Sequence, residues 1–269
     1  MFENILKKNL DINFKKETNF YTFEIPDFLS DEQYDLLDQN FPRLGIDEGS
    51  KINPSFYDTS KQHQLKTWIS VLHPEVYSKH VLSNRILNEF VNTIKSVEFT
   101  DFLLKKFYYK ILKSRIYDPK NLLKLLLRKN RAYTIRSNTI EKFIFNEIFT
   151  TVEWIYNYNG AESYPHTDGK KKILSLLLYF PDKELSDNQV NNLGTTFFNS
   201  SEHDLASRKI TNKNQADDFR KRYSSFTLPF KKKSLFGFIK SHKSWHSVEP
   251  IDIDKNFIRK SININLLLT

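Results

Sequence analysis

Two side chains that can bind a metal ion, His166 and Asp168, stand two residues apart in the stretch SYPHTDGK (163–170). An aromatic segment precedes this stretch and an apolar one follows it, which predicts a short connection between strands. In extended backbone, residues two apart point the same way, so both side chains can reach one ion. Polar loops often contain such a pair, and a metal site therefore requires a third ligand from elsewhere in the chain.

The third ligand is sought among the downstream histidines His203, His242 and His246. His246 lies in SWHSV, a predicted strand, and His242 competes with it because the two residues would share a strand face. We select His246. Two histidines and one carboxylate on one face leave coordination positions open, as in non-heme Fe(II) sites. Zinc is more often enclosed in a tetrahedron.

A basic residue and a hydroxyl follow on the last predicted strand. Arg259 and Ser261, in IRKSININL, are two residues apart and share one strand face. A guanidinium beside a hydroxyl suits the bidentate capture of a carboxylate. They are therefore candidates for holding the far end of a co-substrate that binds the metal. The alternative is an ordinary surface arginine on a terminal strand.

The elements that must position these residues change character near residue 131. Before it, the pattern is mostly helical. Ser30 and Gln33 form a capping-box pattern ahead of an apolar periodicity. Helical spacing continues over 61–96 and 99–129, and NFYTFEIP (19–26) predicts an early strand.

After residue 131 the pattern predicts short β-strands separated by turns. Residues 199–223 are polar and predict a long loop or an insertion with a helix. We expect one domain over 1–269, of α+β class with a mainly β core. Its N-terminal helical layer (1–130) would pack on a jelly roll (131–269) that carries the metal site. The expected strands are TVEWIYNYNG, KILSLLLYFP, GTTFF, SSFTLPF, SLFGFIK, SWHSV and FIRKSININLLL.

Composition excludes several kinds of function. The chain has no cysteine, which rules out disulfides, zinc-thiolate sites and thiol nucleophiles. The net charge is +9, but basic residues cluster only at 105–136. That cluster suits a phosphate, an acidic sugar, a nucleic acid or an anionic lipid. An ordinary helix pair with solvated lysines explains it better, because the apolar spacing accounts for the helices, and we do not expect a nucleic-acid partner.

Targeting features are also absent. The first residues lack the apolar core of a signal peptide. No apolar run approaches the roughly 18 residues of a membrane span. We therefore expect a cytoplasmic protein without a membrane span.

Residues 150–269 resemble the Fe(II)/2-oxoglutarate-dependent dioxygenases, in particular their prolyl-hydroxylase-like branch. The family motif H-x-D, a distant H and a late R-x-S reads here as His166 and Asp168, His246 in HSV, then Arg259 and Ser261. GTTFF, KKKSLFGF and the early PDFLSDEQYDLL are similar to family segments in the same order. The spacing from His246 to Arg259 is somewhat longer than usual in the family.

This resemblance implies a double-stranded β-helix with Fe(II) held by His166, Asp168 and His246. 2-Oxoglutarate would be the co-substrate, consumed with O2 to give succinate and CO2, and ascorbate could stimulate the reaction. Arg259 and Ser261 would hold its C5 carboxylate. Hydroxyls of Tyr156 and Tyr158 would assist, unless these rings are core aromatics. No catalytic residue beyond the metal ligands is implied.

The resemblance also bears on the outcome of the reaction. Related halogenases lack the carboxylate that Asp168 supplies, which favours hydroxylation. The primary substrate is expected to be a small molecule or glycan precursor, with a protein (prolyl-type) hydroxylase acting on a peptide as the alternative. A third class is a non-redox, metal-binding jelly-roll module. Arg259 and Ser261 separate that class from the oxygenases, because only a co-substrate carboxylate requires them.

Overall fold

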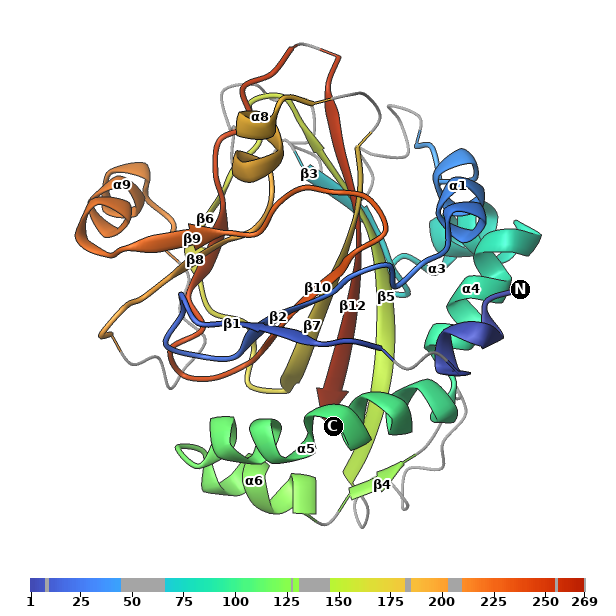
Figure 1. Cartoon of the computed structure of the whole chain (residues 1–269), viewed down its shortest axis with the longest axis horizontal. Coiled ribbons are helices and arrows are strands. Elements are labelled where there is room, and N and C mark those ends of the chain that lie inside the picture. Colours follow the sequence, from blue (N-terminus) through green and yellow to red (C-terminus); the bar gives the residue numbers. More distant parts are fainter. Residues whose placement is uncertain are drawn as a thin grey trace.

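The computed structural model describes residues 1–7, 10–44, 66–126, 128–130, 146–181, 185–202, 210–254 and 256–268. In these residues, two β-sheets enclose a cavity and helices pack outside the larger sheet (Figure 1). The strands are β1 (Asn13–Lys15), β2 (Thr22–Ile25), β3 (Lys66–Ile69), β4 (Arg128–Asn130), β5 (Asn146–Tyr158), β6 (Ser163–His166), β7 (Lys172–Phe180), β8 (Thr196–Phe198), β9 (Ser225–Thr227), β10 (Leu235–Ile239), β11 (His246–Val248) and β12 (Ile258–Leu268).

The helices lie mostly in the first half of the chain. No helix in the part that the structure describes is long and apolar enough to cross a membrane. The α-helices are α1 (Asp31–Gln39), α3 (Pro74–Tyr77), α4 (Arg85–Ile94), α5 (Val97–Arg115), α6 (Pro119–Leu126), α8 (Asp187–Asn192) and α9 (Lys213–Arg222), with a 3-10 helix η1 (Glu3–Lys7) and a π-helical turn η3 (Ser78–Leu82).

The strand order mixes segments that are distant in sequence. The larger sheet has the order β1-β2-β10-β7-β12-β5-β3, with β4 also paired to β5. The smaller sheet has the order β6-β11-β8-β9. All these pairs are antiparallel except β4 with β5. Two facing antiparallel sheets of this kind are compatible with the predicted jelly roll.

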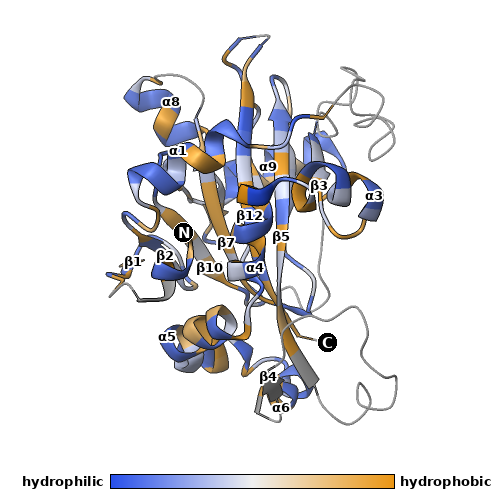
Figure 2. Cartoon of the chain, turned by 90° about the vertical axis from the view of Figure 1, so that its right-hand side faces the viewer, coloured by the Kyte–Doolittle hydropathy of each residue, from blue (hydrophilic) through white to orange (hydrophobic). Residues whose placement is uncertain are grey.

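The helical layer packs on the larger sheet through aromatic side chains. Phe107 of α5 stacks on Phe23 of β2, with ring centroids 4.4 Å apart. Phe41, which follows α1, meets Trp154 of β5 edge-to-face at 5.2 Å. Figure 2 shows β7 as largely hydrophobic, whereas α5 carries both hydrophobic and hydrophilic residues. That pattern is typical of a helix with one face on a core and the other in water.

Several sequence predictions about local structure are confirmed. The helix after Ser30 has the full capping box: Gln33 N donates to Ser30 Oγ and Ser30 N donates to Gln33 Oε1. The polar segment 199–223 contains α9. In the basic cluster, Phe107 and Ile111 are buried while Lys105 and Lys106 are exposed, as expected of an ordinary amphipathic helix. The part of the cluster at 131–136 lies outside the described residues.

One prediction about the N-terminal half is wrong. The stretch 61–96 was expected to be helical before Pro74, but Lys66–Ile69 is strand β3. It pairs antiparallel with β5, so that Lys66 stands opposite Asn157. Four residues carry too little periodicity to distinguish helix from strand, and the edge of β5 supplies the hydrogen bonds that decide it. As a result, the N-terminal part contributes strands to the larger sheet as well as helices.

Candidate metal centre

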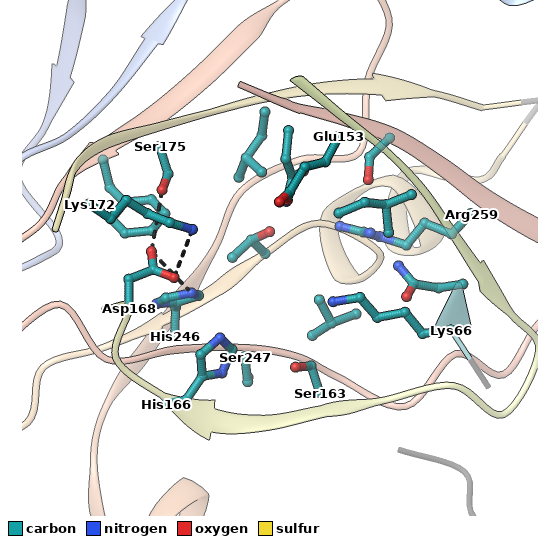
Figure 3. A pocket seen from close by; sticks show the side chains of 18 residues that line it. Lys66, Glu153, Ser163, His166, Asp168, Lys172, Ser175, His246, Ser247 and Arg259 are labelled. Atoms are coloured by element: carbon teal, nitrogen blue, oxygen red, sulfur yellow. Dashed lines mark hydrogen bonds and ion pairs between the residues drawn. The ribbon is translucent and has the colours of Figure 1, made fainter. Parts of the chain in front are cut away.

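The structure brings His166, Asp168 and His246 together at one end of the cavity, where strands β6 and β11 of the smaller sheet pair (Figure 3). His166 ends β6 and His246 begins β11, and the two residues are direct partners in the pairing of these strands. Their ring centroids are 4.3 Å apart. Asp168 follows two residues after His166, and one possible ligand atom from each residue lies within 4.8 Å of the others. Two histidines and a carboxylate in this arrangement can hold a divalent metal ion.

Backbone carbonyls fix the orientation of both imidazole rings. His166 Nδ1 lies 2.8 Å from the carbonyl oxygen of Tyr164, and His246 Nδ1 lies 3.0 Å from that of Ser244. A carbonyl oxygen only accepts, so each Nδ1 must be the protonated donor. Each Nε2 then keeps its lone pair for a metal. This is the usual outer-shell support of metal-binding histidines.

The two carboxylate oxygens of Asp168 have different neighbours. Lys172 Nζ lies 2.9 Å from Oδ1. Oδ2 accepts a hydrogen bond from Ser175 Oγ at 3.3 Å and lies 4.0 Å from His246 Nε2. Oδ2 is therefore the oxygen that faces the histidines. The backbone next to Lys172 is fixed in turn by Arg115, whose guanidinium donates to the carbonyls of Lys170 and Lys172.

The protonation states of the three groups suit metal binding. Burial, together with the neighbouring His246, lowers the pKa of His166 to about 3. Burial also lowers the pKa of His246. Burial alone would raise the pKa of Asp168, but the charge of Lys172 and the two histidines outweigh it and hold that pKa well below its usual range. Near neutral pH the site thus offers two neutral imidazoles and one carboxylate.

The competing histidines lie elsewhere. His242 lines a different pocket, where its ring centroid is 4.4 Å from that of Tyr117. His203 lies outside the described residues. The strand pairing therefore places His246, and not His242, beside the pair in SYPHTDGK.

Arg259 and Ser261 line the same cavity, which has a volume of about 160 Å³. Arg259 is only 2% exposed. Its Nε donates to the carbonyl of Leu193 at 2.5 Å, and its guanidinium lies over the rings of Tyr179 and Phe230, at 5.0 and 5.5 Å. No carboxylate among the described residues pairs with it. A buried cation without an anionic partner is costly, and an anionic ligand would offset that cost.

Tyr156 and Tyr158 do not reach this cavity. Both line a separate pocket beside Phe41 and Pro42, on the face of β5 that meets the helical layer. The Tyr156 hydroxyl donates to the carbonyl of Pro42. Side chains alternate along a strand, so the cavity receives the odd-numbered residues of β5. The expectation that the two tyrosines hold the co-substrate is therefore not supported by where they lie, and their position is that of core aromatics.

Sequence reasoning missed several residues of the cavity wall. Once it is known that the odd-numbered residues of β5 face the cavity, the alternation in TVEWIYNYNG identifies the cavity residues of that strand. Lys172 and Ser175 lie on β7 and were read only as part of an apolar strand. The missed polar residues include Lys66, Glu153, Asn157, Lys172, Ser175 and Asn263.

No protein-family model matches the chain, and no curated protein matches it. Several similar solved structures contain, or are described as dependent on, alpha ketoglutarate (2-oxoglutarate). The epimerase SnoN in complex with Fe3+, alpha ketoglutarate and nogalamycin RO has a TM-score of 0.46 and 8% identity, over 99% of this chain and 83% of that one. EctD from S. alaskensis, with 2-oxoglutarate and 5-hydroxyectoine, has a TM-score of 0.41 and 10% identity, over 91% and 71%.

A Pseudomonas putida prolyl-4-hydroxylase has a TM-score of 0.28 and 12% identity, over 44% of this chain and 49% of that one. The chain thus spans about half the length of that hydroxylase. All these similarities are distant. We therefore base the function proposed below on the side chains of the cavity.

Proposed function

We propose that the protein is an Fe(II)- and 2-oxoglutarate-dependent dioxygenase that hydroxylates a small molecule. The observation that carries this proposal is the sharing of one cavity by two sites. One is the open group of His166, Asp168 and His246, and the other is the buried Arg259 with Ser261. A metal-binding module without redox chemistry would have no need of the second site.

Each residue has a defined task in this reaction. His166 and His246 would hold the iron through Nε2, and Asp168 would hold it through Oδ2, because Lys172 is paired with Oδ1. When bound, Fe(II) supplies O2 activation coupled to the conversion of 2-oxoglutarate to succinate and CO2. The chain itself orients the reactants and limits the access of water.

Arg259 and Ser261 would bind the C5 carboxylate at the far end of 2-oxoglutarate. The guanidinium presents the planar fork that a carboxylate accepts in bidentate fashion, and the Ser261 hydroxyl adds a donor. Tyr179 and Phe230 cover the guanidinium with their rings. That cover keeps the local dielectric low and strengthens the contact.

The cavity supports a small and polar primary substrate. It is small, at about 160 Å³, and its wall is rich in charged and polar side chains. Both features favour a small polar molecule, including a glycan precursor, over a peptide. Related halogenases lack the carboxylate that Asp168 supplies, and its presence therefore favours hydroxylation.

Iron binding tests the proposal without knowledge of the substrate. Metal analysis of the anaerobic protein should give one Fe(II) per chain, and His166→Ala or His246→Ala should abolish binding at micromolar iron. His242→Ala is the matched control and should keep its iron. Retention of iron by His246→Ala together with its loss from His242→Ala would show that the wrong histidine was assigned.

A further inference from the structure

One arginine connects the two strands that carry the histidine ligands. Arg220 lies on α9, which packs beside the smaller sheet (Figure 1). Its Nη2 lies 3.2 Å from Oε2 of Glu162, the residue directly before β6. Its Nε lies 2.8 Å from Oε2 of Glu249, the residue directly after β11. Because β6 and β11 are antiparallel, the two glutamates stand at the same end of the strand pair, and one guanidinium holds both.

The strand that carries His166 is weakly held by its sheet. β6 is the edge strand of the smaller sheet, and β11 is its only partner strand in the described part of the chain. The register of this pair shifts just after the match of His246 with His166. Pro165, at the irregular point, has no N–H to donate to the ladder. Contacts outside this short ladder therefore contribute to the position of His166 relative to His246.

Helix α9 presents Arg220 to the two strands from a fixed position. Phe219 on the same helix is only 4% exposed and packs on Trp245, with ring centroids 4.8 Å apart. Asp217, one turn earlier on α9, lies 3.1 Å from Arg220 Nη1 and directs the guanidinium. The helix thus combines an apolar anchor with an oriented charge.

The two glutamates pass this constraint to the metal centre. The side chain of Glu162 is 1% exposed, and a buried carboxylate separated from its cation is strongly unfavourable. The start of β6 therefore stays where Arg220 reaches it. Glu249 accepts a hydrogen bond at Oε1 from Ser247 Oγ. Ser247 is the neighbour of His246 on β11 and lines the cavity, so the constraint extends to the cavity wall.

We propose that Arg220 is a positioning residue of the metal centre, which sets how His166 and His246 face each other by holding β6 and β11 together. The inference rests on the metal site of the proposed function, because it assigns how that site keeps its geometry. Arg220 does not line the cavity and acts only through the two strands. Weakening this bridge should loosen the ligand group and weaken iron binding in a protein that still folds.

The first test variant is Arg220→Lys. Lysine keeps a charge beside the buried Glu162, but it lacks the planar fork that spans two carboxylates. The melting temperature should stay close to that of the parent, whereas anaerobic Fe(II) binding should be about tenfold weaker, at the lower end of the effect of groups that orient metal ligands. With Co(II) in place of Fe(II), the d–d absorption bands should change, because they report ligand geometry. Arg222→Lys is the matched control on α9, since Arg222 pairs with Glu202 and touches neither strand end, and it should match the parent.

The second variant, Glu249→Gln, separates the bridge from the buried ion pair. It leaves Arg220 paired with Glu162 and keeps an acceptor for Ser247, but it removes the charge contact to β11. Iron binding should weaken less than in Arg220→Lys, because one of the two contacts remains. This variant decides the question if Arg220→Lys does not fold.

The outcomes separate this inference from the proposed function. If folded Arg220→Lys binds Fe(II) like the parent and its Co(II) spectrum is unchanged, Arg220 only anchors α9, and the inference is overturned while the proposed function stands. Parental iron affinity in Glu249→Gln has the same meaning where Arg220→Lys does not fold. A parent that binds Fe(II) but not 2-oxoglutarate overturns the proposed function alone. A parent that binds no Fe(II) overturns both.

Discussion

Replacing Arg259 by alanine should weaken 2-oxoglutarate binding while leaving the iron in place. Arg259 is 2% exposed, has no carboxylate partner among the described residues, and shares its cavity with the metal ligands. The variant loses a charge-assisted bidentate contact in a desolvated site. A truncation of this kind costs on the order of 2–5 kcal/mol, which corresponds to roughly 30- to 5,000-fold weaker affinity.

Related substitutions divide this loss into its parts. Arg259→Lys keeps the charge but not the planar fork, and it should recover part of the affinity. Ser261→Ala removes a single hydrogen bond and should cost about 0.5–1.5 kcal/mol. Stability is a poor readout here, because Arg259→Ala removes both an unfavourable buried charge and the favourable bond to the Leu193 carbonyl.

The assay is a calorimetric titration of 2-oxoglutarate into each anaerobic, Fe(II)-loaded variant. Arg222→Ala is the matched control, since Arg222 is exposed and pairs with Glu202, and its affinity should be unchanged. If Arg259→Ala binds 2-oxoglutarate as tightly as the parent, the assignment is refuted. Arg220 is an unsuitable substitute because Glu162, Asp217 and Glu249 already engage it, and Arg208 lies outside the described residues.

Three further predictions concern stability and pH. Gly194→Ala would place its Cβ 1.6 Å from the carbonyl oxygen of Leu228, and it should lower the free energy of unfolding by more than about 2 kcal/mol in urea titrations. Gly169→Ala is the control: its Cβ would meet no atom within 4 Å, and it should change the free energy of unfolding by less than about 0.5 kcal/mol. Burial alone would raise the pKa of Glu24, but Lys231 and Lys15 lower that pKa below its usual 4.5. The stabilisation from these ion pairs is present above pH 4.5 and is lost as the pH falls through the lowered pKa. In Glu24→Gln, the free energy of unfolding should therefore depend less on pH in the acid range. Tyr156→Phe should lower the free energy of unfolding by about 1–3 kcal/mol, because it leaves the buried Pro42 carbonyl without its hydrogen-bond donor. The affinity for 2-oxoglutarate should not change. A large loss of affinity would instead place Tyr156 in the co-substrate site.

The grouping of His166, Asp168 and His246 could be anticipated from the sequence because its determinants are largely local. His166 and Asp168 stand two apart on extended backbone, and a third ligand had only a few histidines to come from. The choice between His242 and His246 depended on the register of β11 against β6, which the residues themselves do not reveal. The capping box at Ser30 was equally readable, because it lies within four consecutive residues.

The parts that could not be predicted depend on tertiary packing. Both faces of β5 contain polar and aromatic side chains, so its alternation alone does not say whether Tyr156 or Glu153 faces the cavity. The helical layer decides this by packing Phe41 against Trp154 and Tyr156. Strand β3 forms because β5 offers an edge to pair with. Lys172 acquires its role only when the chain after Asp168 turns back and brings the two charges together.

The most direct test of the proposed function is the visible spectrum of the anaerobic Fe(II) protein during a titration with 2-oxoglutarate. Chelation by the co-substrate at an open iron site produces a metal-to-ligand charge-transfer band. We expect this band to saturate at one 2-oxoglutarate per iron and to be absent in His246→Ala. A protein that binds iron but develops no band with 2-oxoglutarate would contradict the assignment and leave a metal-binding module without this redox chemistry.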